Sequence, residues 1–346
     1  SAMHSVSVRI SPMVPPCCFD LRQHKCTRHA RTLLDICRDR RWFALKSPHM
    51  RSSLPIMTDT PVLLSLGHGF SARALTRRLL PQGWEVIGTT RSTDKLDALR
   101  DTGVTPILWN KDAIEDVLPR ATHLLISAGP SDDGDPSLAL VGDAIRARAR
   151  NLDWCGYLST TGVYGNHDGA WVDETAGMTP TGKRGRLRVE AEAEWLAIPD
   201  LPLHIFRLAG IYGPGRGPFE KVRAGRAQQV VKKGQVFSRI HVDDIAQVLE
   251  ASINRPNPGS AYNVCDDDPA PPQDVIAYAA ELLGVPAPPE VPFEEAEMTP
   301  MARSFYADNK RVRNERIKSE LGVRLKYPDY RAGLAAILAA EGEREG

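Results

Sequence analysis

The pattern of hydrophobic and polar residues becomes regular at residue 61. From there, short apolar runs alternate with segments in which apolar residues recur every three or four positions. The first kind is typical of buried parallel strands and the second of amphipathic helices. The predicted strands are 61–66, 85–89, 104–108, 123–127, 155–159 and 203–207. The predicted helices are 71–80, 94–100, 137–150, 184–197 and 242–253, with a further helix from Val275 to Leu283.

Strands that alternate with helices predict a parallel, doubly wound sheet with helices on both faces. We therefore expect residues 58–346 to form an α/β Rossmann-type fold. The second half is less periodic, and proline-rich stretches at 269–272 and 286–292 flank its helix. These features predict a small C-terminal α/β lid over the strand ends, interleaved with the main fold and built from about 166–190, 208–240 and 262–330.

Residues 1–57 lack this periodicity, and we expect them to be a disordered extension. Their arginine-rich, acid-poor composition leaves an organelle-targeting peptide open as an alternative. A cluster of metal-binding residue types also lies there, but without a recognised zinc spacing, so no metal site is predicted. The cluster comprises Cys17, Cys18, Cys26, His29 and Cys37.

Charge and composition limit the classes of function. The formal net charge is +1, but residues 1–57 hold 10 basic and 3 acidic residues, which leaves the rest of the chain at −6. An acidic body argues against nucleic-acid binding. No apolar run approaches the roughly 18 residues of a membrane helix. Beyond residue 57 the cysteines are Cys155 and Cys265, far apart, which indicates no disulfide framework and predicts a cytoplasmic protein.

A glycine-rich turn follows the first predicted strand. It reads G-x-G-x-x-A, lies between a strand and an amphipathic helix, and comprises Gly67, His68, Gly69, Phe70, Ser71 and Ala72. In this context the first glycine permits a tight turn, the second admits a pyrophosphate, and the helix N-terminus attracts the phosphates. The turn therefore predicts a dinucleotide site, with a ligand-free tight turn as the alternative.

The end of the second strand indicates which dinucleotide binds. NAD sites usually place a carboxylate there, whereas this chain continues with Thr90, Arg91 and Ser92. Arg91 could pair with a 2′-phosphate and Ser92 could add a hydroxyl donor, so NADP(H) is favoured over NAD(H). The alternative is that Arg91 is a solvated loop residue. Small residues after the fourth strand should also pass beside the cofactor, namely Ser127, Ala128 and Gly129.

Four further stretches carry a family resemblance. They are Ser-Thr-Thr-Gly-Val-Tyr-Gly at 159–165, Arg-Leu-Ala-Gly-Ile-Tyr-Gly-Pro at 207–214, Arg-Ile-His-Val-Asp-Asp-Ile-Ala at 239–246, and Ala-Tyr-Asn-Val at 261–264. In this order they resemble the extended short-chain dehydrogenase/reductase family, which includes the NAD-dependent epimerase/dehydratases. The resemblance covers nearly all of residues 61–337. It implies a Rossmann fold, a nicotinamide cofactor and a small-molecule substrate.

The resemblance also exposes a departure at the active site. The family's catalytic Ser/Thr matches Thr160, but its Tyr and Lys positions are occupied by Arg184 and Arg188. Arginine does not exchange protons near neutral pH, although Arg188 could still hold the nicotinamide ribose. The chain is therefore identified as an atypical member. Candidate proton donors are Tyr164 and His167, whose alternatives are a packed structural tyrosine and a solvated loop histidine; Thr160 could instead satisfy backbone at the strand end.

Two hypotheses for the function remain open. The first is an NADP(H)-binding oxidoreductase or epimerase/dehydratase with a rearranged active site. The second is a non-catalytic dinucleotide-binding regulatory or scaffold protein. In either case we expect Arg184 and Arg188 to bind an anionic group, which could be a phosphate, a substrate carboxylate, or a carboxylate of the same helix. Of Glu190 and Glu192, only Glu192 lies at the favourable spacing from Arg188. The alternative is that these arginines belong to a solvated helix start. The resemblance also suggests a homodimer through the helices 137–150 and 184–197.

The start of the periodic pattern yields a test. A chain that begins at Met57 should keep the thermal stability of the full chain, because every predicted element lies after residue 60. Calorimetric melting of both forms checks this. A large fall in Tm for the shorter chain would show that the N-terminal segment packs on the body.

Overall fold

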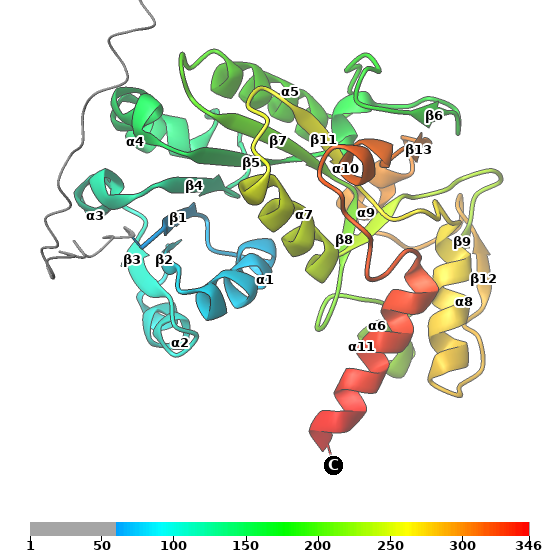
Figure 1. Ribbon diagram of the computed structural model, residues 1–346. Helices are drawn as coiled ribbons and strands as arrows, with labels where there is room; N and C mark the ends of the chain where they lie inside the picture. The colour runs from blue at the N-terminus through cyan, green and yellow to red at the C-terminus, as the bar shows by residue number, and fades with distance from the viewer. Residues whose placement is uncertain (1–59, 346) are drawn as a thin grey trace, which may run out of the picture. The chain divides into compact units, whose positions relative to one another are not determined.

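The computed structural model describes residues 60–345 (Figure 1). The predictions made for residues 1–57, namely the extension, the targeting alternative and the cysteine cluster, lie outside the described residues. No helix in the described part of the chain is long and apolar enough to cross a membrane.

A seven-stranded parallel sheet forms the centre of the fold, with strand order β11-β7-β5-β4-β1-β2-β3. The order reverses at β1, so the crevice between the ends of β1 and β4 is the usual ligand position in such sheets. The predicted Rossmann-type fold is confirmed. The strands are β1 Val62–Leu66, β2 Glu85–Thr90, β3 Thr105–Leu108, β4 His123–Ile126, β5 Trp154–Thr160, β7 Leu203–Leu208 and β11 Ala261–Val264.

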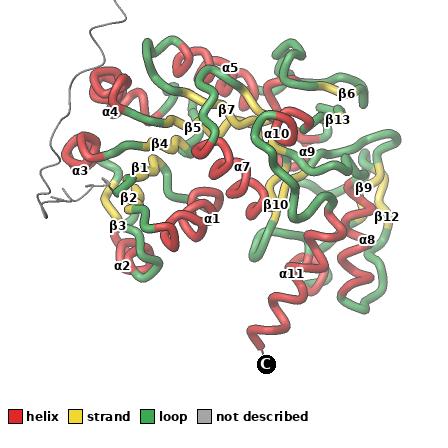
Figure 2. Tube along the Cα trace, in the orientation of Figure 1, coloured by secondary structure: helices red, strands yellow, loops and turns green. Residues whose placement is uncertain are grey.

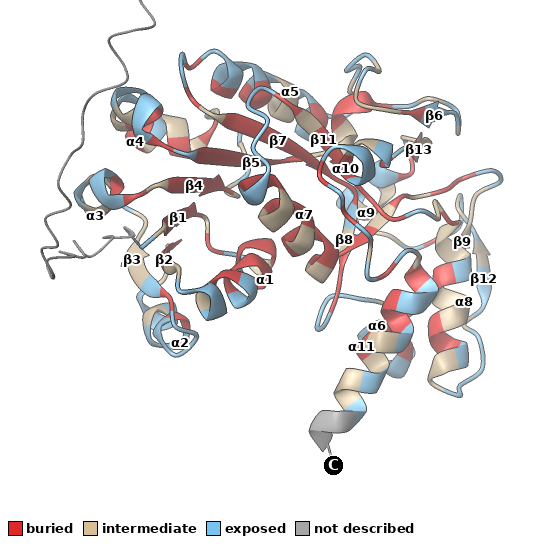
Figure 3. Cartoon of the chain, viewed as in Figure 1, coloured by how far each residue is buried: buried red, intermediate tan, exposed pale blue. Residues whose placement is uncertain are grey.

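Both faces of the sheet are buried, which explains the continuous apolar runs (Figure 3). Successive residues of a strand point to opposite faces, so Leu63 and Leu64 enter different cores. Leu63 packs with α1 (Phe70–Leu79) and α7 (Val242–Asn254), which lie side by side (Figures 1 and 2). Leu64 packs in the core that also holds residues of the helices on the other face, α3 Lys111–Val117, α4 Pro136–Arg148 and α5 Lys183–Leu196.

The structure differs from the sequence prediction at three elements of the main fold. Helix α3 was not predicted, although Asn110 caps it by accepting from the Ala113 N–H at 2.9 Å. Strand β11 was not predicted either, because its mixed residues show no period. Helix α4 was predicted as continuous but is broken at Val141, which has φ −135° and ψ 19°. Short α2, Leu96–Arg100, lies within the predicted helix 94–100.

The lid is built from short pieces on the same side as the C-terminal helix (Figures 1 and 2). Its strands form three parallel pairs: β8 Gly210–Tyr212 with β10 Arg239–His241, β9 Gln229–Val231 with β12 Glu290–Pro292, and β6 Trp171–Val172 with β13 Arg311–Val312. Its helices are α6 Phe219–Arg223, α8 Pro272–Leu282, α9 Pro300–Phe305, α10 Glu315–Ser319 and α11 Tyr330–Glu345. A separate core joins α6, α8 and α11.

One glycine of the loop after β5 should be indispensable for stability. Gly165 has φ +72°, and a Cβ atom there would lie 1.9 Å from the Thr179 carbonyl oxygen. Gly165→Ala should therefore lower the free energy of unfolding by about 2 kcal/mol or more, because backbone must move and the left-handed φ is strained. Urea unfolding measures this. The matched control is Gly177→Ala, where a Cβ meets nothing within 4 Å; equal stability of the two variants would contradict the prediction.

Candidate functional site: a dinucleotide crevice and an adjoining cavity

The glycine turn is held in place by the Thr89 side chain of the neighbouring strand β2. The Gly67 N–H donates to Thr89 Oγ1 at 2.7 Å, and the Thr89 hydroxyl donates to the Ser65 carbonyl at 3.1 Å. Gly67 has φ +88°, and a Cβ there would lie 2.7 Å from the Ala128 nitrogen. Both observations require glycine. No side chain caps α1 at Gly69, so the N–H groups of its first turn stay available for phosphate oxygens.

His68 lies beneath the turn and packs against β2. A Cβ on Gly88 would lie 2.7 Å from the His68 ring, and neither ring nitrogen has a hydrogen-bond partner among the described residues. Burial, assisted by the charge of Arg73, lowers the pKa of His68 to about 4, so the ring is neutral at physiological pH. Ser71 is also buried, whereas Phe70 is half-buried beneath the Arg216 guanidinium, 5.6 Å from its ring centre.

The end of β2 presents an arginine that is free of protein carboxylates. Arg91 is exposed, and its guanidinium carbon lies 5.6 Å from the centre of the Trp109 ring, just after β3. No carboxylate among the described residues lies within ion-pair distance of it. Ser92 is half-buried, and its N–H donates to Thr90 Oγ1 at 3.2 Å. Trp109 was not identified from the sequence, although an aromatic residue after the third strand is a detectable signal.

The residues after β4 lie against the glycine turn. The Ser127 hydroxyl donates to the Gly67 carbonyl, so this side chain supports the turn. The Ala128 N–H donates to the Leu66 carbonyl at 3.1 Å. Gly129 leaves room for the Arg188 guanidinium, because a Cβ there would lie 2.9 Å from Arg188 Nη2. Ser127 thus contacts the turn, while Gly129 contacts Arg188 in the adjoining cavity.

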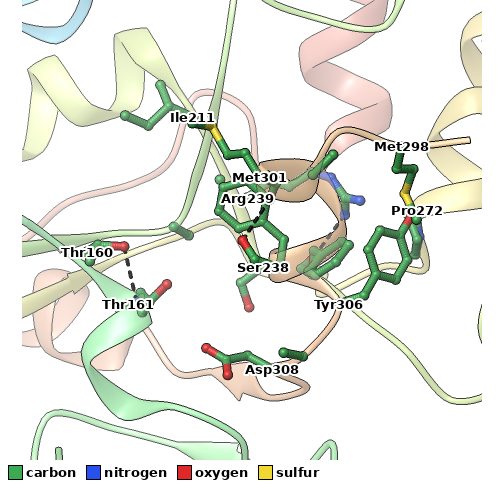
Figure 4. Close-up of a pocket in the computed structure, with 18 of the residues that line it drawn as sticks. Thr160, Thr161, Ile211, Ser238, Arg239, Pro272, Met298, Met301, Tyr306 and Asp308 are labelled. Atoms are coloured by element: carbon green, nitrogen blue, oxygen red, sulfur yellow. Dashed lines mark hydrogen bonds between the residues drawn. The ribbon is translucent and has the colours of Figure 1, made fainter. Parts of the chain in front are cut away.

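That cavity has a volume of about 1250 Å³ and lies between the end of β5 and the lid. Thr160, Arg184, Arg188 and Gly129 line it, but the turn residues 67–71 do not. Figure 4 shows Thr160 and Thr161 on one side and Met298 and Tyr306 on the other. The structure therefore brings together three of the four residues predicted to be catalytic and places them beside the crevice.

Thr160, Arg184 and Arg188 differ in how many hydrogen bonds their side chains make within the protein. Thr160 Oγ1 accepts from the Gly162 N–H at 3.1 Å, so it caps the turn while facing the cavity. Arg188 donates to the Tyr157 hydroxyl at 3.1 Å and to the Leu158 carbonyl. Arg184 is exposed in the cavity, with its guanidinium carbon 5.8 Å from the centre of the Phe305 ring. Neither arginine pairs with a carboxylate of the described chain.

Tyr164, the fourth predicted catalytic residue, is buried away from the cavity. Its side chain is 0% exposed, its hydroxyl donates to Asn263 Oδ1 at 2.7 Å, and it accepts from Arg207 Nη1 at 2.9 Å. Burial raises the pKa of Tyr164, against the opposing charge of Arg207. Its position does not support a proton donor, because the hydroxyl is fully engaged and closed to a ligand. The alternative reading, a packed structural tyrosine, matches this environment.

The buried partner of Arg207 is Glu192, which corrects the expectation for the helix carboxylate. Glu192 accepts from Arg207 Nη2 at 2.8 Å and from the Ser159 hydroxyl, and the two charged side chains are 1% and 7% exposed. Glu192 therefore neutralises Arg207, not Arg188. The sequence spacing placed Glu192 one helical turn from Arg188, but the burial of Arg207 on β7 could not be read from it.

Two titratable residues of the cavity wall were missed by sequence reasoning. Lys310 donates to the Gly165 carbonyl at 2.8 Å and lies 3.4 Å from Asp308, which itself accepts from the Thr181 hydroxyl. Burial lowers the pKa of Lys310, opposed by Asp308. His167 contacts the Tyr164 carbonyl at 3.1 Å and is not part of the cavity lining. Lys310 is 150 residues from Thr160 in the sequence, so no local pattern could predict that both line the same cavity.

Comparison with known proteins places this arrangement in a family. No protein-family model matches the chain. Protein YeeZ of Escherichia coli K12 is 30% identical over 282 residues, which cover 76% of this chain and 95% of YeeZ. A functionally unknown conserved protein from Silicibacter pomeroyi, of solved structure, is 61% identical with a TM-score of 0.76, over 82% of this chain and 99% of that one.

Two further solved structures share the fold. A candidate NAD-dependent epimerase/dehydratase from Methylobacillus flagellatus is 27% identical, with a TM-score of 0.64 over 82% of this chain and 99% of that one. The human epimerase family protein SDR39U1, solved with NADPH, is 19% identical, with a TM-score of 0.65 over 81% and 99%. Sheet order and glycine turn define a Rossmann-type protein, and the solved structures that it resembles include NAD-dependent epimerase/dehydratase-like proteins. The chain belongs to the same family as protein YeeZ.

The buried ion pair gives a stability test. Glu192→Gln should lower the free energy of unfolding by about 3 to 5 kcal/mol, because it leaves the Arg207 charge buried without compensation. Chemical denaturation measures the change. Glu190→Gln on the same helix removes an exposed carboxylate and should change stability by less than about 0.5 kcal/mol. Similar losses of unfolding free energy in both variants would show that the buried pair with Arg207 does not contribute more to stability than an exposed carboxylate.

Proposed function

We propose that this chain is an NADP(H)-dependent enzyme, an oxidoreductase or epimerase/dehydratase, whose proton transfer does not use the family's Tyr and Lys. The observation that carries the proposal is the crevice itself. The glycine turn lies at the switch point of the sheet, and helix α1 after it has no side-chain cap. Arg91, at the end of the neighbouring strand, lies over Trp109 and has no carboxylate partner in the described chain. NADP(H), when bound there, supplies the hydride chemistry of the family.

The choice of NADP(H) rests on the chemistry at the end of β2. A 2′-phosphate needs a cation and hydroxyl or amide donors, and Arg91 and Ser92 offer these at the right strand end. NAD(H) would need an acceptor for its ribose hydroxyls, and Thr90, Arg91 and Ser92 provide no carboxylate. Arg91 already stacks on Trp109, so its side chain loses less conformational entropy when it binds a phosphate.

The residues around the cavity suggest how this chain binds the nicotinamide end of the cofactor and the substrate. Arg188 occupies the position of the family lysine and is suited to hold the nicotinamide ribose by hydrogen bonds. Thr160 faces the cavity and can orient a substrate oxygen. Lys310 is one of the titratable groups of the cavity wall, and its lowered pKa suits proton exchange better than any arginine.

A non-catalytic dinucleotide-binding protein is the second candidate, and one observation favours it: arginines stand at both family proton-transfer positions. The open cavity beside Thr160 favours the enzyme. Monitoring NADPH absorbance with a panel of aldehydes and ketones separates the two. Turnover that Lys310→Met abolishes while NADPH binding persists would support the enzyme; binding without turnover for any panel member would favour the scaffold.

The cofactor assignment has a direct test. Arg91→Ala should weaken NADPH binding by about one to two decades, as expected for loss of a charge-assisted contact of roughly 1.5–3 kcal/mol, and should leave NADH binding unchanged. Titration calorimetry with both cofactors measures this. Arg100→Ala, on the following helix and paired with Asp97, is the matched control. Equal affinity of the parent for NADPH and NADH, or no effect of Arg91→Ala, would refute the assignment.

A further inference from the structure

The cavity wall is strongly basic within an acidic body. Seven lysines and arginines line it against two carboxylates, Glu297 and Asp308. The chain beyond residue 57 has a net charge of −6. Basic residues are thus concentrated where a ligand would enter, which is the arrangement that attracts anions. The seven are Lys183, Arg184, Arg188, Lys221, Arg226, Arg239 and Lys310.

Four of these cations are already engaged, which leaves Arg184, Lys221 and Arg226 exposed and without a hydrogen-bonding side-chain partner among the described residues. Lys183 pairs with Asp132 at 2.5 Å, Lys310 lies 3.4 Å from Asp308, and Arg239 donates to the carbonyls of Phe237 and Ala270. Arg188 donates to Tyr157 and Leu158. Arg184 has neither a carboxylate nor a hydrogen-bond acceptor among the described residues, and it stands exposed in the cavity.

An apolar wall adjoins this free cation. Helix α9 and the residues on either side of it contribute Met298, Met301, Phe305 and Tyr306 to the lining. Met301 is 61% exposed and Phe305 55% exposed, which is unusual for large apolar side chains and marks a surface that a ligand can cover. The Arg184 guanidinium lies 5.8 Å from the centre of the Phe305 ring, so cation and apolar surface are contiguous.

From this juxtaposition we propose that the substrate is an amphipathic carboxylic acid. Its carboxylate binds Arg184, and its apolar body covers Phe305 and Met301. The proposal rests on the proposed function, because it names the substrate class of that same site. A planar guanidinium binds a carboxylate through two parallel hydrogen bonds, and a ligand body of aromatic or aliphatic carbon would bury the exposed side chains of α9.

The cofactor itself does not account for Arg184. Under the proposed function its phosphates would bind the glycine turn and Arg91, and none of the turn residues 67–71 lines the cavity. Arg188, one helical turn deeper, lies against Gly129 and Leu158 at the crevice side. Arg188 therefore faces the cofactor half, while Arg184 faces the lid and is left for a second ligand.

A pair of probes with the same shape and different charge tests the proposal. 4-Phenylbutyrate and its neutral amide, 4-phenylbutyramide, are titrated into the full chain by calorimetry, with and without NADP⁺. The acid should bind at least about tenfold more tightly than the amide. Arg184→Gln should remove most of that difference, a loss of about 10- to 100-fold for the acid alone. Arg186→Gln is the matched control, because Arg186 lies on the same turn but outside the cavity lining.

The outcomes separate this inference from the cofactor assignment. Unaltered NADPH affinity in Arg184→Gln, with acid binding lost, supports the inference. Reduced NADPH affinity in Arg184→Gln would assign the arginine to the cofactor and overturn it. Equal binding of acid and amide, or no binding of either, would also overturn it. A parent chain that binds the acid but not NADPH would refute the proposed function and leave the anion site standing.

Discussion

The buried ion pair between Arg207 and Glu192 is the constraint on which the site depends. Arg207 extends from β7 and Glu192 from α5, and the same network includes Ser159 on β5 and Tyr164 in the following turn. Two charges removed from water must stay paired, so neither element can shift without a large loss of free energy. The helix that carries Arg184 and Arg188 is therefore fixed against the strand end that carries Thr160.

This network also explains why the tyrosine of the Val-Tyr-Gly motif stays in the interior. Tyr164 joins Arg207 to Asn263 on β11, and Asn263 in turn donates its N–H to Glu174 at 2.7 Å. The edge strand of the sheet, the loop after β5 and helix α5 are thus held together by hydrogen-bonded polar groups, of which Asn263 Nδ2 alone has no partner among the described residues. Such a network specifies one arrangement, because any member left alone would be buried without a partner.

A second link ties the lid to the main fold. Asp244, within the first turn of α7, is fully buried and accepts from the backbone N–H groups of Lys326 and Tyr327 at 2.7 and 3.0 Å. His241, at the end of β10, caps the same helix by accepting from the Asp243 N–H at 3.2 Å. The cavity lies between the end of β5 and the lid, and this helix links the lid to the main fold, so the basic and apolar residues of the cavity are held in fixed positions.

The sequence by itself determined the parallel sheet and the glycine turn, because these depend on local periodicity and on neighbouring residues. Leu63 and Leu64 reveal a strand buried on both faces, and Gly67 and Arg91 lie within one βαβ unit. Tertiary structure alone decided which carboxylate neutralises which arginine, that Tyr164 is enclosed, and that Lys310 and Phe305 reach the cavity. Those contacts join residues up to 145 positions apart, and pairings over such separations produce no periodic pattern in the sequence.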